Sequence, residues 1–207
     1  MLVFGASGHG KVVADIVRAT GLELAGFVDD DPCRRNAGLW GLPVLGWNEC
    51  ANLPAGPGRP AIALGIGDNR SRERVFGLIV SSGFEVLTVV HPSAVISPRA
   101  KLGVGTVVMA LVAVNPDAEV GVGGILNTGC VVEHDCRVGA FAHLSPNGVL
   151  GGGVEIGDRS HLGLGAVVLP LVKVGSDVRV GAGAAVTKDV PPGATVVGVP
   201  ARSISPR

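Results

Sequence analysis

A period of six residues governs the hydrophobic positions in the second half of the chain. A fixed short period is typical of a solenoid, in which each repeat stacks on the next. We predict that six residues form one short strand and one corner, that three such sides close a triangular coil of 18 residues, and that the aliphatic side chains point inward. The aliphatic positions are Val90, Ile96, Leu102, Val108, Val114, Val120, Leu126, Val132, Val138, Leu144, Leu150, Ile156, Leu162, Val168, Val174, Val180 and Val186.

Two further positions of the repeat carry small residues. The position directly after the aliphatic residue is often glycine, which we attribute to corners that need backbone angles unfavourable to other residues. Four positions after the aliphatic residue, Cys130 and Cys136 are expected to fill the interior on two sides of one coil rather than to form a redox pair. Because residues 18 apart stack on neighbouring coils, His143 should lie beside His161, and neither occupies an inward position.

The first part of the chain follows another pattern, in which short apolar runs alternate with apolar residues at helical spacing. This alternation predicts a small, Rossmann-like parallel α/β sheet, and such sheets bind ligands at the carboxyl ends of their strands. Strands are predicted at residues 2–4, 22–28, 61–66 and 84–90, and helices after residue 10 and over residues 70–82.

The change of pattern sets the expected domain organisation. We expect an α/β domain at residues 1–89, a β-helix at residues 90–190 and a C-terminal tail at residues 191–207. Between the predicted strands, residues 33–60 show no clear period. Trp40 and Trp47 are expected to pack beneath this segment rather than to stack on a base.

A glycine-rich loop follows the first predicted strand. Gly8, His9 and Gly10 stand at the start of the first helix, where backbone N–H groups and the helix dipole attract a phosphate. The spacing is neither the dinucleotide pattern GxGxxG nor a Walker motif, so a simple tight turn is the alternative. Asp29 and Asp30 follow the second strand, where such folds place a carboxylate for a ribose or base. This favours nucleotide binding over a solvated turn.

Composition and charge exclude several classes of function. The chain has 17 basic and 17 acidic residues, and neither sign forms a run, so nucleic-acid binding has no electrostatic support. The four Cys residues show no CxxC spacing, and no apolar stretch reaches the roughly 18 residues of a membrane-spanning helix. The sequence begins without a basic and apolar leader, so we expect a cytoplasmic protein with reduced thiols and no membrane partner.

Polar residues gather in one stretch of the solenoid, residues 127–136. There His134 stands between two carboxylates, and a histidine beside a carboxylate can act as a general base of near-neutral pKa. A solvated surface histidine is the alternative, but the carboxylate neighbours favour the catalytic interpretation. Metal binding by His134, His143 and His161 is a competing hypothesis that the spacing does not favour, and we expect no metal.

Motifs in nearly every part of the chain occur together and in the same order in one known family. They are GASGHGKVV at residues 5–13, FVDDD at 27–31, GIGDNR at 65–70, NT at 127–128, VEHDC at 132–136, HLSP at 143–146 and GVPAR at 198–202. The chain resembles the bacterial sugar acetyltransferases of the sialic acid O-acetyltransferase type, which include nucleotide-sugar N-acetyltransferases of glycan biosynthesis. The resemblance implies a left-handed parallel β-helix of the hexapeptide-repeat acyltransferases and a homotrimer, with acetyl-CoA between adjacent β-helices.

The resemblance also implies roles for individual residues. It makes His134 the base that takes a proton from the acceptor amine, Asp135 its support, and the backbone N–H of Gly152 the donor that steadies the oxyanion. The residues implied to bind the nucleotide sugar are Gly8, His9, Gly10, Asp29, Asp30, Gly67 and Asn127, and those implied to bind acetyl-CoA are His143, Gly165 and Gly183.

The leading hypothesis is an N-acetyltransferase that moves acetyl from acetyl-CoA to the 4-amino group of a nucleotide-linked amino-deoxysugar. UDP is the first candidate for the nucleotide. O-acetylation of a sialic acid or another sugar hydroxyl is the alternative. A non-catalytic sensor is a third hypothesis, which the intact residues 133–135 argue against. A serine acetyltransferase would not explain the N-terminal α/β domain.

Overall fold

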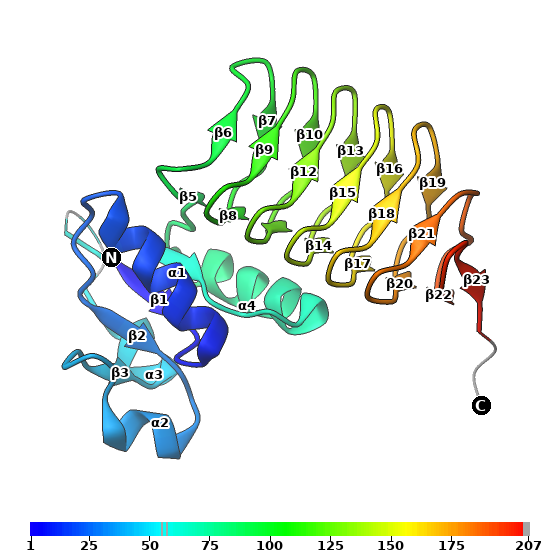
Figure 1. Ribbon diagram of the computed structural model, residues 1–207. Coiled ribbons are helices and arrows are strands. Elements are labelled where there is room, and N and C mark those ends of the chain that lie inside the picture. Colours follow the sequence, from blue (N-terminus) through cyan, green and yellow to red (C-terminus); the bar gives the residue numbers. More distant parts are fainter. Residues whose placement is uncertain (55, 57, 205–207) are drawn as a thin grey trace.

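The computed structural model describes residues 1–54, 56 and 58–204. Its N-terminal unit is a parallel sheet with the strand order β3-β2-β1-β4, flanked by helices (Figure 1). The strands are β1 (Leu2–Phe4), β2 (Gly26–Val28), β3 (Val44–Leu45) and β4 (Ile62–Leu64), and the helices are α1 (Gly8–Ala19), α2 (Pro32–Ala37), α3 (Trp47–Ala51) and α4 (Asn69–Ser81). The predicted small α/β sheet is therefore confirmed. In the described part of the chain, no helix is long and apolar enough to cross a membrane.

The last predicted strand of this sheet is wrong. Residues 84–90 contribute only an isolated parallel bridge between Ile62 and Val86, and their last two residues begin the β-helix. The elements α2, β3 and α3 lie within residues 32–60 and were not predicted. They are two to six residues long, too short to show a period in the sequence.

The two tryptophans of this segment differ in their packing. Trp47 packs against the rings of Phe4 and Phe84, with centroid distances of 5.6 Å and 5.8 Å, as expected. Trp40 is 44 % exposed, and the guanidinium of Arg18 lies 4.9 Å from the centre of its ring. Its ring also meets that of the buried Phe27 at 6.3 Å, so Trp40 covers the edge of the core while Trp47 packs more deeply into it.

The rest of the chain winds into a left-handed parallel β-helix with three sheets (Figure 1). Residues 18 apart pair across adjacent coils, as Leu126 does with Leu144. The first sheet, which we call the docked face, contains β5 (Val89–Val90), β8 (Val107–Val108), β11 (Ile125–Leu126), β14 (His143–Leu144), β17 (His161–Leu162), β20 (Arg179–Val180), β22 (Thr195–Val197) and the antiparallel β23 (Arg202–Ser203).

The other two sheets differ from each other in the outward residue that precedes each inward aliphatic residue. We call the second sheet the apolar face: β6 (Val95–Ile96), β9 (Ala113–Val114), β12 (Val131–Val132), β15 (Val149–Leu150), β18 (Val167–Val168) and β21 (Ala185–Val186). We call the third sheet the charged face: β7 (Lys101–Leu102), β10 (Glu119–Val120), β13 (Arg137–Val138), β16 (Glu155–Ile156) and β19 (Lys173–Val174).

The interior of the β-helix matches the predicted register. The repeat aliphatic residues from Val108 to Val186 are buried, whereas Val90, Ile96 and Leu102 are half-buried because the first coil is covered on one side only. Cys130 and Cys136 are free thiols buried among them, which confirms that they fill space. The stacked methyl groups of this column provide most of the core.

The reason given for the repeat glycines is wrong. The glycine directly after the aliphatic residue does not have a positive φ. Instead it leaves room for the next coil, because a Cβ on Gly121 would lie 2.6 Å from the backbone N of Ala140. The left-handed conformation falls two residues later, at each corner from residue 105 to residue 183. It is adopted by glycine at Gly123 and by other residues elsewhere, such as Asp135.

The C-terminal end continues the docked face beyond residue 190. There β22 pairs with β20 so that Arg179 faces Thr195, which is 16 residues away instead of 18. The last coil is therefore two residues shorter than the others, which ends the period of six after Val186.

Two helices join the N-terminal unit to the β-helix. Val13 and Val17 of α1 pack on the docked face against Val107 and Ile125. In α4 the fully buried side chains include an arginine, whereas Leu78 is 38 % exposed.

That arginine, Arg72, lies wholly buried between the two parts of the molecule. It donates to the carbonyl oxygens of Gly67 on its own side and of Gly123 and Phe141 on two successive coils, at 3.0 Å, 2.7 Å and 2.7 Å. Asn69 extends the series to a third coil, since its Nδ2 donates to the carbonyl of Arg159 at 2.8 Å. The N-terminal unit is thus held at a fixed position along the docked face.

Candidate functional site

His134 and Asp135 form an exposed pair at the corner between the apolar and the charged faces. The distance from His134 Nδ1 to Asp135 Oδ2 is 2.7 Å, and the side chains are 62 % and 66 % exposed. The hydrogen bond to Asp135 raises the pKa of His134, and the charges of Asp135 and Glu133 act in the same direction. With its Nδ1 directed at the carboxylate, His134 keeps Nε2 free to take a proton from a ligand.

Gly152 lies on the next coil, directly beside this histidine. A Cβ at Gly152 would lie 2.6 Å from His134 Nε2, so only glycine leaves the ring in its place. The structure therefore brings together His134, Asp135 and Gly152, the three residues expected to carry the chemistry.

Asn127 lies on a different corner, between the docked and the apolar faces, and His143 lies beside it on β14 of the docked face. Asn127 Nδ2 is 3.2 Å from His143 Nε2. His143 is only 8 % exposed, and its ring stacks on that of His161 at 4.7 Å with an angle of 6° between the planes, as the register predicts. Although Asn127 is only seven residues from His134 in sequence, the apolar face separates them within one chain.

Gly165 and Gly183 continue the corner that holds Asn127. Their φ angles are +63° and +66°, and a Cβ at either residue would meet nothing within 4 Å. The backbone at this corner is therefore open to a ligand or to a second chain.

The glycine loop lies at the N-terminus of α1. Its N-cap residue, Ser7, makes no side-chain cap hydrogen bond, and Gly8 is exposed. Gly10 is required for packing, because a Cβ there would overlap the carbonyl oxygen of Gly5. The ring of His9 lies 6.2 Å from that of His143, so the loop adjoins the Asn127 corner.

The two aspartates after β2 are engaged within the chain. Asp29 accepts hydrogen bonds from the N–H of Ala6 at 2.8 Å and from Arg34 at 2.8 Å, which ties the glycine loop to the end of β2. Burial raises the pKa of Asp29, but these hydrogen bonds outweigh it and the net pKa is lowered. Asp30 accepts from the N–H of Trp47 at 2.7 Å and remains exposed. In the described structure Asp29 thus positions the loop.

A groove of about 810 Å³ runs between the start of α4 and the docked face. It is bordered by Gly67, by the stacked pair His143 and His161, and by cationic residues that include Arg179. Gly67 also presents its carbonyl to Arg72. Since the groove adjoins the carboxyl end of β4, it lies where sheets of this type bind ligands.

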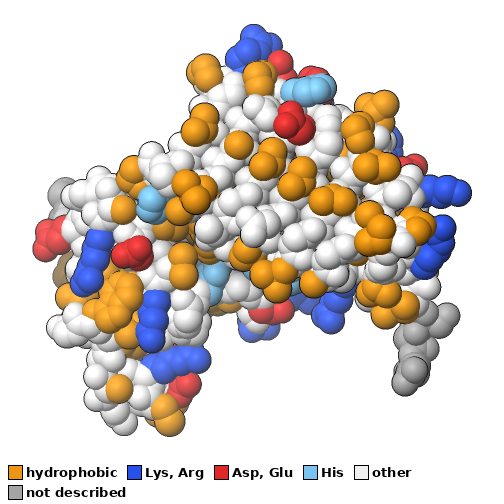
Figure 2. Space-filling view, viewed as in Figure 1, with side chains coloured by type: hydrophobic (Ala, Val, Ile, Leu, Met, Phe, Trp, Pro, Cys, Tyr) orange, Lys and Arg blue, Asp and Glu red, His pale blue; other side chains and the backbone are white. Residues whose placement is uncertain are grey.

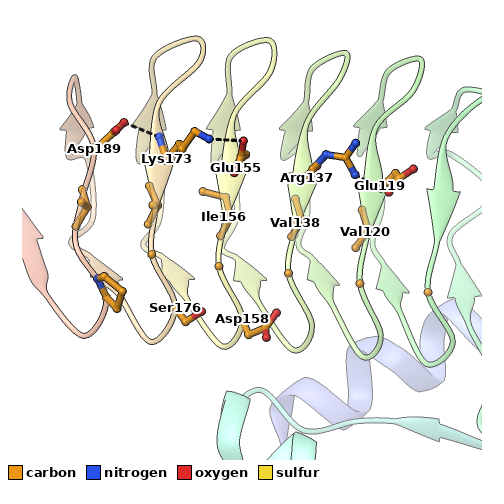
Figure 3. A pocket seen from close by; sticks show the side chains of 18 of the residues that line it. Glu119, Val120, Arg137, Val138, Glu155, Ile156, Asp158, Lys173, Ser176 and Asp189 are labelled. Atoms are coloured by element: carbon orange, nitrogen blue, oxygen red, sulfur yellow. Dashed lines mark hydrogen bonds and ion pairs between the residues drawn. The ribbon is translucent and has the colours of Figure 1, made fainter.

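A second groove, of about 960 Å³, follows the charged face. Its charges are paired along the sheet: Lys101 lies 2.9 Å from Glu119, and Arg137 lies 3.0 Å from the same carboxylate. Figure 3 shows the pair of Lys173 with Glu155, at 2.9 Å. This groove contains none of the predicted site residues.

The predicted residues therefore fall into two groups in one chain. The base group is His134, Asp135 and Gly152. The second group lies on the N-terminal unit, the docked face and the corner of Asn127. It holds the residues expected to bind the nucleotide sugar, Gly8, His9, Gly10, Asp29, Asp30, Gly67 and Asn127, and those expected to bind acetyl-CoA, His143, Gly165 and Gly183. Figure 1 shows that the loop between β12 and β13, which carries His134 and Asp135, and the loop between β15 and β16, which carries Gly152, lie on the side of the β-helix away from the N-terminal unit. Among the described residues, no cluster of three or more His, Cys, Asp or Glu side chains could hold a metal ion.

The sequence did not mark Arg72 as a buried residue. An arginine on a surface helix has no pattern that marks it as buried. The spacing of His143 and His161 did reveal their stacking, because the 18-residue register fixes it.

Comparisons with known proteins agree over the whole chain. Residues 1–79 match the family model described as the PglD N-terminal domain. A histidine-to-asparagine mutant of perosamine N-acetyltransferase from Caulobacter crescentus, solved with CoA and GDP-perosamine, is 42 % identical with a TM-score of 0.93, covering 99 % of this chain and 96 % of that one.

Two further solved structures are similar at full length. The acetyltransferase domain of PglB from Neisseria gonorrhoeae, in complex with acetyl coenzyme A, is 39 % identical with a TM-score of 0.92, and 98 % of each chain is covered. WeeI from Acinetobacter baumannii is 31 % identical with a TM-score of 0.91, again with 98 % of each chain covered. The chain belongs to the hexapeptide-repeat family of nucleotide-sugar N-acetyltransferases.

Proposed function

We propose that this protein is an acetyl-CoA-dependent N-acetyltransferase that acts on an amino group of a nucleotide-linked sugar. The observation that carries the proposal is the base group, with a histidine held by a carboxylate next to a glycine on the adjacent coil. The full-length likeness to an enzyme crystallised with CoA and GDP-perosamine supports both ligands. A role in bacterial glycan biosynthesis, in the cytoplasm where acetyl-CoA is made, is part of the same proposal.

The proposed reaction is a direct acyl transfer. The neutral amine attacks the thioester carbonyl, and the backbone N–H of Gly152 stabilises the oxyanion that forms. His134 Nε2 takes the proton from the amine as the new C–N bond forms, while Asp135 stabilises the imidazolium. The C–S bond then breaks, and His134 returns the proton to the sulfur of CoA. The proton that leaves the amine thus ends on the sulfur of CoA, and the proposed steps use no metal ion.

The nucleotide site is proposed at the carboxyl edge of the N-terminal sheet. Gly8, His9 and Gly10 offer backbone N–H groups at a helix N-terminus, and the exposed Asp30 lies at the end of β2. We propose a UDP-linked 4-amino sugar as the acceptor. GDP is the second candidate, because the Caulobacter enzyme was crystallised with GDP-perosamine.

We further propose that a homotrimer completes the active site. Hydrophobic side chains are spread over the face formed by β6, β9, β12, β15, β18 and β21 (Figure 2), and Val95 at its end is 72 % exposed. His134 and Asn127 lie at corners on opposite edges of this apolar face. A cyclic arrangement that buries the face can bring the His134 of one copy to the Asn127 corner of the next.

Mixing experiments test the shared site. His134→Ala and Asn127→Ala are each expected to be nearly inactive alone. Unfolded and refolded together in equal amounts, they should regain about a quarter of the parent activity. In a random mixture, about one interface in four joins an intact His134 of one copy to an intact Asn127 of the next. A monomer in light scattering at micromolar concentration, or no recovery in verified mixed oligomers, would contradict the trimer.

The acceptor is tested by mass spectrometry. The protein is incubated with acetyl-CoA and a panel of UDP-, GDP- and dTDP-linked amino sugars, with the matching free amino sugars and hydroxyl sugars as controls. We expect a mass gain of one acetyl group on a nucleotide-linked amino sugar, and none with His134→Ala. Equal rates on the free amino sugar would contradict the nucleotide site, and a preference for a hydroxyl sugar would support O-acetylation instead.

A further inference from the structure

The side-chain amide of Asn127 has only one orientation that satisfies its neighbours. The N–H of Thr128 donates to Asn127 Oδ1 at 2.8 Å, and a backbone N–H cannot accept. Asn127 Nδ2 must therefore be the atom that faces His143 Nε2 at 3.2 Å, and an amide nitrogen can only donate. His143 Nε2 consequently has to be an unprotonated acceptor.

This requirement holds only while His143 is neutral. A neutral imidazole with its proton on Nδ1 offers Nε2 as an acceptor, whereas an imidazolium carries a proton on both nitrogens. Protonation would place two donors, His143 Nε2 and Asn127 Nδ2, against each other. The amide would then lose its partner or turn over, and turning over would break the bond from Thr128.

The surroundings of His143 disfavour the charged form. His161 covers one face of the ring, at 4.7 Å and nearly parallel, and is itself held by Ser145 Oγ, 2.8 Å from His161 Nε2. The charged or titratable groups that face His143 are His161 from β17, His9 from α1 and Arg72 from α4. Burial first, and then these groups, lower the pKa of His143 to about 3.

We propose that the stacked pair of His143 and His161 is a positioning device for Asn127. By keeping His143 uncharged and in place, His161 fixes the Asn127 amide as a donor and leaves the second hydrogen of Nδ2 free for an oxygen acceptor of the bound substrate. Asn127 is then the residue that touches substrate, and His143 and His161 act through it. The inference rests on the proposed function only for the identity of that substrate.

Histidine NMR tests the device without any assay of activity. The chain has 5 His residues, so each ring can be assigned by single substitution. In the parent protein, the His143 ring should not titrate between pH 5 and 8. In His161→Ala it should titrate within this range, because one face of the ring becomes hydrated. In Asn127→Asp, which is nearly the same shape, a carboxylate facing Nε2 should also raise the pKa of His143.

Kinetics give the second measurement. If the pKa of His143 in His161→Ala approaches its ordinary value of about 6.5, about nine tenths of the rings are charged at pH 5.5. The kcat/KM of His161→Ala divided by the kcat/KM of the parent should then be about tenfold lower at pH 5.5 than at pH 8. His161→Phe keeps a flat ring over His143 and should show no such pH dependence of the ratio. His91→Ala, on the first coil, is the matched control.

The two failures are distinguishable. If the parent protein acetylates no amino sugar but the NMR titrations behave as stated, the proposed function fails and the device stands. If His143 stays unprotonated down to pH 5 in both folded variants, or if His161→Phe and His161→Ala have the same pH-dependent ratio, the positioning role is overturned. Thermal unfolding of each variant shows whether it is folded.

Discussion

In the β-helix a residue meets its spatial neighbour 18 positions along the chain, whereas in the N-terminal unit the partners lie at irregular distances. Val138 pairs with Val120 and Ile156 in one repeated geometry, while Asp29 reaches back to Ala6 and Arg72 reaches forward to Phe141. Because the inward residues alone maintain the repeat, the outward side chains of each face of the β-helix can differ from those of the other faces. The N-terminal unit has no such repetition, so its place depends on a few specific side chains.

The first prediction breaks the repeated geometry from inside. Val138→Asp would place an unpaired carboxylate among stacked methyl groups, at a cost of several kcal/mol, and should prevent soluble expression. The matched control is Arg137→Ala at the adjacent outward position, which should express like the parent. Soluble, thermally stable Val138→Asp would show that the aliphatic column is not essential to the core.

The second prediction breaks the junction between the two regions. Arg72→Met fills similar space but leaves the carbonyls of Gly123 and Phe141 without their donor, with an expected loss of about 3 kcal/mol. Thermal unfolding and limited proteolysis near residues 65–90 should both reveal the loosened N-terminal unit. Arg74→Met on the same helix, whose parent side chain is exposed, is the control and should change neither measurement.

The contrast between the regions also explains what the sequence could reveal about the fold. The period of six located the strands and the inward residues. A shift of the register by one residue would turn the aliphatic side chain of every repeat outward, so the pattern allows only one register. The junction left no such pattern. Arg72 reads as a solvated helix residue, and its burial depends on carbonyls about 50 and 70 positions away that no local rule connects to it.

The third prediction concerns the chemistry on the corner between the apolar and the charged faces. His134→Ala should lower kcat by about 10² or more with little change in acetyl-CoA binding, as expected for loss of a general base. Single-turnover kinetics and calorimetric titration with CoA measure the two quantities separately. His91→Ala should retain the parent kcat. Near-full activity of folded His134→Ala would leave the histidine as a surface residue without a catalytic role.

The candidate site was only partly predictable for a related reason. The pairing of His134 with Asp135 is local, and the proximity of Gly152 follows from the 18-residue register, so both can be read from the sequence. Asn127 stands close to His134 along the chain, yet a corner intervenes and places it on the opposite edge of the apolar face. Sequence distance is therefore a poor guide to the site where the chain turns every six residues.

The last prediction tests whether the carboxylate of Asp135 raises the pKa of His134 through direct contact. Asp135→Asn should lower kcat/KM a few fold, less than His134→Ala, because the base remains but its imidazolium loses a carboxylate. The hydrogen bond to Asp135 raises the pKa of His134. Without it the pKa of His134 falls, so the acidic limb of the kcat/KM profile should move to lower pH.

Asp117→Asn is the matched control. Asp117 occupies the same corner one coil earlier, also with a positive φ, but pairs with Arg99. An unchanged acidic limb in Asp135→Asn, or an equal shift in Asp117→Asn, would mean that the carboxylate does not tune the base through direct contact.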